Sequence, residues 1–175
     1  MDLAALVRNV PDFPKPGVQF KDITPLLMNT QAFREIIDGW RDRYADKKLD
    51  AIVGAEARGF VFGAPLAYAM GLPFVLIRKR GKLPADTFSV DYELEYGTES
   101  FQIHTDALKP GDRVVLVDDL LATGGTMAGM VQLVRRLEAE IVELAFVIEL
   151  GFLGGRAQLE GLPIHTLIRY DNEES

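Results

Sequence analysis

The sequence predicts an α/β fold, a doubly wound and mainly parallel sheet within a single domain of 175 residues. Four or five apolar, strand-like segments alternate with segments of helical periodicity. Residues 59–77 contain no charged residue, but Pro65 and the break Gly71-Leu72-Pro73 divide them into a helix and a strand. A membrane span is therefore not expected there.

The N-terminal region is expected to form a short helix over residues 2–8 and then an irregular loop. Four prolines and a glycine fall between residues 10 and 25, which argues against regular backbone hydrogen bonding in that segment. Phe20 lies within it between polar neighbours. From the residues alone it is either a platform on which a flat base stacks or a core anchor for the loop.

The middle of the chain predicts a helix, then two strands flanking a second helix, then a hairpin. Asn29-Thr30 can cap a helix that continues to about residue 47 with one apolar face. Residues 50–55 predict a strand that ends in a loop, with a helix from about Phe60 to Met70. A buried strand follows at 73–77, and the alternation over 85–103 is typical of an exposed hairpin that could act as a lid.

Two segments next to these strands carry cationic side chains that suit an anion. Arg58 follows the strand at 50–55 and can clamp phosphate oxygens, although a surface ion pair with Glu56 is the alternative. Basic residues also gather in the segment 78–84, just after the strand at 73–77. In an acidic chain this cluster favours an anion such as pyrophosphate, unless it is only a solvated turn.

The most informative stretch is a strand that runs into two carboxylates and a glycine-rich loop. Val114–Val117 precede Asp118 and Asp119, and Ala122-Thr123-Gly124-Gly125-Thr126 then open a helix that extends to about residue 138. Backbone N–H groups at a helix start bind anions, and glycine lets a phosphate come close. Carboxylates would repel a bare phosphate but accept hydrogen bonds from sugar hydroxyls. The stretch therefore predicts a ribose 5-phosphate site, with a capped helix and a solvated acid pair as the alternative.

Composition limits the remaining possibilities. The net charge of −7 argues against a nucleic-acid surface, and the absence of cysteine excludes disulfides, thiolate catalysis and cysteine-ligated metals. The first eight residues do not have the pattern of a signal peptide, so a cytoplasmic protein is expected. Further strands are predicted at 141–150 and 163–168, separated by a loop at 151–156. His104 and His165 are isolated and receive no role.

Residues 117–126, Val-Asp-Asp-Leu-Leu-Ala-Thr-Gly-Gly-Thr, resemble the phosphoribosyl-pyrophosphate motif of type I phosphoribosyltransferases, in the form found in members that act on adenine. The resemblance implies transfer of the 5-phosphoribosyl group from phosphoribosyl pyrophosphate to N9 of adenine, giving AMP and pyrophosphate in purine salvage. It implies that Mg²⁺ takes part and is held mainly by the substrate rather than by direct protein ligands. The ribose 5-phosphate would be bound by Asp118, Asp119, Ala122, Thr123, Gly124, Gly125 and Thr126.

Other segments extend this resemblance over most of the chain. The segment that includes Gln19, Phe20 and Lys21 is similar to the family's adenine-binding segment, with Leu120 as a further contact. The run 56–60 is similar to its pyrophosphate loop, which often has a cis peptide at the position between Glu56 and Ala57. The implied pyrophosphate contacts are Glu56, Ala57, Arg58, Arg78, Lys79 and Lys82.

The resemblance also implies a homodimer in which Arg78 reaches the neighbouring subunit's site. In the hairpin, Glu95 matches the proposed proton acceptor and Tyr96 its neighbour in a flexible loop. The implied catalytic residues are Glu95, Asp118, Asp119 and Arg58. A small hood would consist of residues 1–25 and the flexible loop 79–103. Two alternatives remain open, the same fold acting on another nucleobase and a non-catalytic regulator that binds phosphoribosyl pyrophosphate.

Overall fold

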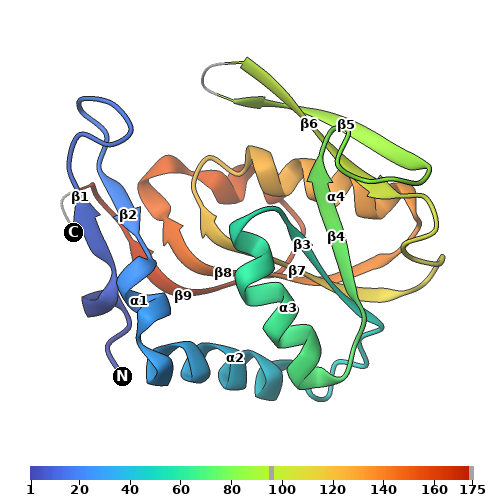
Figure 1. Cartoon of the computed structure of the whole chain (residues 1–175), viewed down its shortest axis with the longest axis horizontal. Helices are drawn as coiled ribbons and strands as arrows, with labels where there is room; N and C mark the ends of the chain where they lie inside the picture. Colours follow the sequence, from blue (N-terminus) through green and yellow to red (C-terminus); the bar gives the residue numbers. More distant parts are fainter. Residues whose placement is uncertain (95–96, 174–175) are drawn as a thin grey trace.

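The computed structural model describes residues 1–94 and 97–173, and its centre is a seven-stranded sheet in the order β5-β6-β4-β3-β7-β8-β9 (Figure 1). Five of these strands are parallel: β3 (Ala51–Ala55), β4 (Phe74–Lys79), β7 (Arg113–Leu121), β8 (Glu140–Leu150) and β9 (Ile164–Tyr170). The remaining two, β5 (Thr87–Leu94) and β6 (Gly97–His104), form an antiparallel hairpin. The predicted doubly wound, mainly parallel sheet is confirmed.

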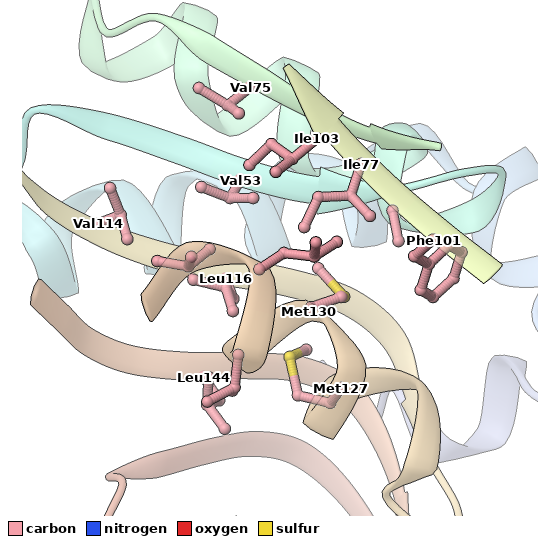
Figure 2. Packing of buried hydrophobic residues seen from close by; sticks show 14 of the residues in the cluster. Val53, Val75, Ile77, Phe101, Ile103, Val114, Leu116, Met127, Met130 and Leu144 are labelled. Atoms are coloured by element: carbon pink, nitrogen blue, oxygen red, sulfur yellow. The ribbon is translucent and has the colours of Figure 1, made fainter. Parts of the chain in front are cut away.

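Helices cover both faces of the sheet, because successive strand residues point to opposite faces and both sets are apolar. On one face, α2 (Thr30–Tyr44) and α3 (Arg58–Met70) pack with Ile52, Val115 and Val117. On the other face, α4 (Gly125–Arg136) inserts Met127 and Met130 against Val53 and Leu116 (Figure 2). Burial of each such aliphatic side chain stabilises the folded state by about 1.5–3 kcal/mol. The packing in these two cores therefore determines where the helices lie on the sheet.

The start of α2 is fixed by its sequence-predicted cap. The Asn29 side chain accepts a hydrogen bond from the backbone N–H of Ala32 at 3.0 Å. Trp40 and Tyr44 lie on the buried face of this helix, which confirms the single apolar face that the sequence predicts. No helix within the described residues has the length and apolar character needed to cross a membrane.

The N-terminal region is more regular than the sequence predicted. A 3₁₀ turn at Ala4–Leu6 leads into β1 (Arg8–Val10), which pairs antiparallel with β2 (Phe20–Asp22), and α1 (Thr24–Met28) follows. The expectation of an irregular loop over 10–25 was therefore wrong for part of this segment. Residues 17–24 contain no proline, so their backbone N–H groups can pair even though prolines flank them.

The hairpin is part of the main sheet rather than a separate flap. β6 pairs antiparallel with the end of β4, where Arg78 lies opposite Gln102 and Lys79 opposite Phe101. β4 therefore continues to Lys79, beyond the predicted strand end at residue 77. Figure 1 shows the hairpin beyond β4, while β1 and β2 lie on the opposite side of the molecule beside β9. A common hood made of these two parts stays a prediction.

Candidate functional site

A cleft of about 340 Å³ opens at the carboxyl ends of β3 and β7. Ligand sites of open parallel sheets lie at this edge, because the loops that follow the strands gather there. The cleft is lined by residues from the loops after these strands, from the end of β4 and from the hairpin: Glu56, Ala57, Arg58, Lys79, Tyr92, Glu99, Phe101, Asp118, Asp119, Leu120, Leu121, Ala122, Thr123, Gly124, Gly125, Thr126 and Met127.

The predicted phosphate loop forms the floor of this cleft at the start of α4. β7 runs on to Leu121 through its pairing with β8, so the loop is only three residues long before α4 begins at Gly125. Gly124 precedes the helix with φ +89°, a conformation that favours glycine. No side chain in the described part of the chain caps this helix start. Its first N–H groups are therefore available to an anion.

A second glycine, Gly155, packs directly against the backbone of this loop. A Cβ on Gly124 would lie 2.5 Å from the carbonyl oxygen of Gly155, and a Cβ on Gly155 would collide with the carbonyl oxygen of Ala122. The two backbones are thus in direct contact without side chains between them. This contact fixes the height of the loop relative to the 3₁₀ turn Gly155–Leu159.

Asp118 and Asp119 stand side by side at the end of β7, just before the loop. Asp119 is buried, with 5% of its surface exposed, and its backbone N–H donates to Oδ1 of Asp118 at 2.9 Å. Loss of water around the Asp118 carboxyl, together with the neighbouring Asp119 carboxylate, raises the pKa of Asp118 well above its ordinary value. Such a pair is electrostatically unfavourable in isolation and suits hydroxyl or cationic partners.

Arg58 brings a cation to this acid pair from the first turn of α3. Gly59 allows the approach, because a Cβ there would lie only 2.9 Å from the carbonyl oxygen of Val117 on β7. The Arg58 Nε atom lies 2.5 Å from Oδ2 of Asp119. Among the described residues, Arg58 thus pairs with Asp119, and the alternative ion pair with Glu56 is not formed.

Glu56 instead ties the loop after β3 to β4. Its Oε1 atom accepts a hydrogen bond from the backbone N–H of Lys79 at 2.7 Å and lies 3.3 Å from Nε of Arg78. The peptide bond between Glu56 and Ala57 is cis, as the resemblance implied. The Glu56 contacts with β4 hold the start of this loop, and the next residues, Ala57 and Arg58, line the cleft.

The hairpin contributes three cleft residues that were not predicted. Tyr92 donates a hydrogen bond to Glu99 at 2.8 Å and stacks on Phe101 with ring centroids 4.4 Å apart. Lys79 completes this group through an ion pair with Glu99 at 3.1 Å. These hydrogen bonds, first from Tyr92 and then from Lys79, lower the pKa of Glu99. The hairpin register sets Tyr92 opposite Glu99, and the pairing of β6 with β4 adds Lys79 opposite Phe101, so no single local pattern signals this group.

Some predicted site residues do not line the cleft. Arg78 and Lys82 lie outside it, and Glu95 and Tyr96 fall outside the described residues. Phe20 lies nearby: the Arg58 guanidinium carbon is 5.9 Å from its ring centroid, and Phe13 packs edge-on against it. Oε1 of Gln19 is buried without a hydrogen-bond partner among the described residues, while Lys21 packs its ammonium over the Tyr170 ring.

Asp118 and Asp119 are the acidic side chains that could contribute ligands to a metal ion in the part of the cleft that β7 forms. Among the described residues no cluster of three or more His, Cys, Asp or Glu side chains could hold a metal ion by itself. Asp118 and Asp119 nevertheless place carboxylates at the cleft wall. Mg²⁺ commonly binds through one or two carboxylates together with phosphate oxygens of a substrate. The two carboxylates therefore fit a Mg²⁺ ion whose other ligands are phosphate oxygens of a substrate.

Comparison with known proteins agrees with this geometry. Residues 23–173 match the phosphoribosyl transferase domain family. The chain is 56% identical over 169 residues to the adenine phosphoribosyltransferase of Chloroflexus aurantiacus, covering 97% of this chain and 98% of the relative.

Two solved structures of adenine phosphoribosyltransferases are also similar. The Thermoanaerobacter pseudethanolicus enzyme has a TM-score of 0.92 at 50% identity and covers 97% of this chain and 98% of its own. The Saccharomyces cerevisiae enzyme, complexed with an imino-altritol bisphosphate and adenine, has a TM-score of 0.90 at 42% identity, covering 95% and 96%. The chain therefore belongs to the phosphoribosyltransferase family, among its adenine phosphoribosyltransferases.

Proposed function

We propose that this protein transfers the 5-phosphoribosyl group from phosphoribosyl pyrophosphate to N9 of adenine, producing AMP and pyrophosphate for purine salvage. The observation that carries the proposal is a single cleft that combines an uncapped helix start, an acid pair and Arg58. Relatives above 50% identity that are named for this activity support the choice of adenine. The lack of cysteine, together with the composition, supports a cytoplasmic location as part of the same proposal.

In this proposal the sugar and its phosphate define the position of the reacting carbon. The loop Ala122–Thr126 binds the 5-phosphate through backbone N–H groups and the Thr123 and Thr126 hydroxyls. Asp118 and Asp119 accept hydrogen bonds from the ribose hydroxyls and favour the positive charge that develops on the sugar ring as pyrophosphate departs. Binding at both ends orients the anomeric carbon toward the base.

The pyrophosphate half would occupy the opposite wall. Glu56 orders the backbone of residues 56–58 through its contacts with β4, so Ala57 can offer its backbone while Arg58 offers a planar guanidinium. Lys79 adds a second cation within the cleft. Lys82, exposed just beyond β4, is assigned by the resemblance alone. Bound Mg²⁺ would contribute charge neutralisation of the departing pyrophosphate.

The base would lie between Phe20 and the sugar site. Phe20 is near Arg58, and Leu120 lines the cleft wall beneath. The buried acceptor of Gln19 and the backbone of residues 19–21 supply polar atoms for reading the base edge. The resemblance alone assigns Glu95 as the proton acceptor and Tyr96 as its neighbour. A closed, dry site would allow Glu95 to take the purine proton.

A homodimer is also part of the proposal, and exposed apolar side chains support it. Tyr68 on α3 is 90% exposed, which is unusual for a large aromatic residue. Leu76 is exposed too and shares a face of β4 with Arg78, on the side of the sheet that carries α3. A partner that covers this face would bring Arg78 close to a subunit boundary.

Subunit mixing tests whether Arg78 acts in the partner's site. An Arg78→Ala chain and a chain with Asp118→Asn and Asp119→Asn should each have little activity. A mixed dimer regains one complete site, which combines the intact acid pair of one chain with Arg78 of the other. Activity that returns after unfolding and joint refolding supports action in trans. A monomer by sedimentation, or no recovery, contradicts it.

The function is tested by product formation from phosphoribosyl pyrophosphate and Mg²⁺ with adenine, hypoxanthine, guanine, xanthine, uracil and orotate in parallel. AMP as the single nucleotide product is expected. Another nucleotide would keep the sugar site but contradict the choice of base. Binding of phosphoribosyl pyrophosphate without any product would favour the regulator instead, against which the net charge of −7 argues where nucleic acid is the target.

A further inference from the structure

Glu149, at the end of β8, is a buried carboxylate for which the proposed reaction has no use. Only 2% of its surface is exposed. Arg156 binds it with both arms of the guanidinium, Nε to Oε1 and Nη2 to Oε2, each at 2.7 Å. Nη1 of Arg169 at 2.9 Å and the Thr166 hydroxyl at 3.1 Å donate as well. These donors, Arg156 foremost, lower the pKa of Glu149 and keep it ionised.

Arg156 lies next to the glycine that supports the phosphate loop. Gly155 is buried, and its backbone contacts Ala122 and Gly124 so closely that neither glycine has room for a Cβ. The residue before it, Gly154, has φ +68° and ends the preceding 3₁₀ turn, Gly151–Leu153. The position of Gly155 therefore depends on what holds residues 151–156, and the bidentate, charge-assisted bond from Arg156 ties this segment to β8.

The same strand also anchors the loop from its other end. Glu149 on β8 lies opposite Leu121 on β7, the residue directly before Ala122. Glu149 therefore contacts both sides of the phosphate loop. Its backbone pairs with the end of β7 before the loop, and its carboxylate binds Arg156 in the turn that packs against the loop. A shift of Arg156 would move Gly155, and with it the carbonyl of Ala122 and the N–H of Gly124.

We propose that the Glu149–Arg156 pair is a positioning device for the 5-phosphate site, acting through Gly155 on the loop 122–126. This inference rests on the proposed function, since it assigns the loop to the 5-phosphate of phosphoribosyl pyrophosphate. Neither side chain lines the cleft. Both act on the substrate through the backbone that they hold.

The chain contains a matched control pair on the same strand. Glu143 is also buried on β8, also bound by both arms of an arginine, Arg43, at 2.7 Å, and also bonded to a hydroxyl, that of Tyr44. This second pair joins β8 to α2, and its three side chains lie outside the cleft. Arg43→Ala therefore removes the same kind of interaction without moving the phosphate loop.

The experiment compares steady-state kinetics of Arg156→Ala, Arg156→Lys, Glu149→Gln and Arg43→Ala. Arg156→Ala should raise the KM for phosphoribosyl pyrophosphate roughly tenfold or more, because small displacements of a positioning group are costly. Its KM for adenine should change by less than about twofold. Arg156→Lys keeps the charge but loses the fork and should fall between. Arg43→Ala should lower the melting temperature while leaving both KM values near those of the wild type.

Equal KM values for phosphoribosyl pyrophosphate in Arg156→Ala and Arg43→Ala would overturn the inference, as would a parallel rise in both KM values of Arg156→Ala. If Arg156→Ala does not fold, Arg156→Lys and Glu149→Gln decide by the same comparison. Gly155→Ala should reproduce the KM effect directly, with Gly39→Ala as its control, because a Cβ at Gly39 meets no atom within 4 Å.

A binding measurement separates this inference from the proposed function. Calorimetric titration with phosphoribosyl pyrophosphate and Mg²⁺, and with ribose 5-phosphate, needs no base. Wild-type binding without AMP formation would contradict the proposed reaction, yet weaker binding by Arg156→Ala than by Arg43→Ala would still support the positioning role. Wild-type AMP formation with identical affinities in these two variants would contradict the positioning role alone.

Discussion

The guanidinium of Arg58 and the carboxylate of Asp119 join the two halves of the cleft, with Nε and Oδ2 2.5 Å apart. Arg58 belongs to the first turn of α3 and Asp119 to the end of β7, so the pair joins the wall of the cleft proposed to bind pyrophosphate to the wall proposed to bind ribose. The Arg58 side chain is 51% exposed, and solvent screens such a pair. Its main effect is therefore expected on substrate geometry rather than on stability.

Replacement of Arg58 should impair turnover much more than folding. Arg58→Ala removes a cation from the cleft and leaves Asp119 without this partner, so kcat/KM should fall by about 10²–10³-fold, as for loss of a charge-stabilising group. The melting temperature should change by no more than about 2–4 °C. Steady-state kinetics and thermal unfolding monitored by circular dichroism measure the two effects.

Arg58→Lys is the matched variant, because it keeps the charge and loses the planar fork. It should retain more activity than Arg58→Ala. A large loss of melting temperature in both variants, with kcat/KM reduced only in proportion to the unfolded fraction, would show that the arginine is structural.

Asp118→Asn should abolish most turnover and yet stabilise the fold at neutral and alkaline pH. The pKa of Asp118 is raised above 3.8 in the native state, chiefly by burial and then by Asp119, so the folded protein binds this proton more tightly than the unfolded chain. The contribution of the Asp118 carboxyl to the free energy of unfolding is therefore most favourable below pH 3.8, and it is lost as the pH rises through the raised native pKa. Asparagine avoids that cost and keeps the acceptor for the Asp119 N–H.

Melting temperatures of wild type and Asp118→Asn between pH 4 and pH 8 check this sign. The variant should melt ~2–4 °C higher at pH 8, and the difference should shrink toward pH 4. The variant that also carries Asp119→Asn should remain folded and inactive. Unfolding of that double variant at pH 7 would mean that the acid pair is structural.

Gly59→Ala should displace α3 from β7. The new Cβ would lie 2.9 Å from the backbone carbonyl oxygen of Val117, and backbone on both sides leaves it no easy escape. Overpacking of this kind costs about 1–3 kcal/mol, and it would also move Arg58 away from Asp119. The free energy of unfolding, measured with denaturant, and kcat/KM should both decrease. Gly39→Ala, in the exposed part of α2, should leave both values near those of the wild type. Wild-type activity in Gly59→Ala would contradict the close approach.

His165→Gln should reduce the loss of stability that the protein undergoes as the pH falls from neutral to acid. Burial, and next the nearby Arg43, lowers the pKa of His165 below 6.5, with Glu143 opposing them. The unfolded chain therefore takes up this proton more readily, and the stability present above pH 6.5 declines as the pH falls through the lower native pKa. The drop in melting temperature from pH 7.5 to pH 5.5 should be smaller in the variant. An unchanged drop would contradict this account, and activity at pH 7.5 should stay near wild type because His165 lies outside the cleft.

The sequence by itself determined the parts of this protein whose physics is local. The apolar run 114–117 predicted the buried strand that β7 forms, and the glycines and threonines that follow predicted free N–H groups at a helix start. Asn29 fixed the start of α2, and the break Gly71-Leu72-Pro73 divided the apolar run into α3 and β4, whereas Pro65 lies within α3 and does not end it. The strand, the short loop and the helix start around the acid pair could therefore be predicted from local residue patterns alone, as could the alternation of strands and helices, whereas phosphate binding at this loop stays a prediction.

Only the tertiary structure decided which distant segments meet. The pairing of β6 with β4 brings Tyr92, Glu99 and Phe101 into the cleft, and nothing in the hairpin sequence encodes that register. The regular pairing of β1 with β2 was missed for a different reason, because the flanking prolines drew attention away from residues 17–24, which contain none. Gly155 against Gly124, and Glu149 bound to Arg156, likewise depend on backbones that approach each other only after the core has packed. Local sequence sets hydrogen-bonding capacity and periodicity, whereas contact between remote segments is set by packing of the whole chain.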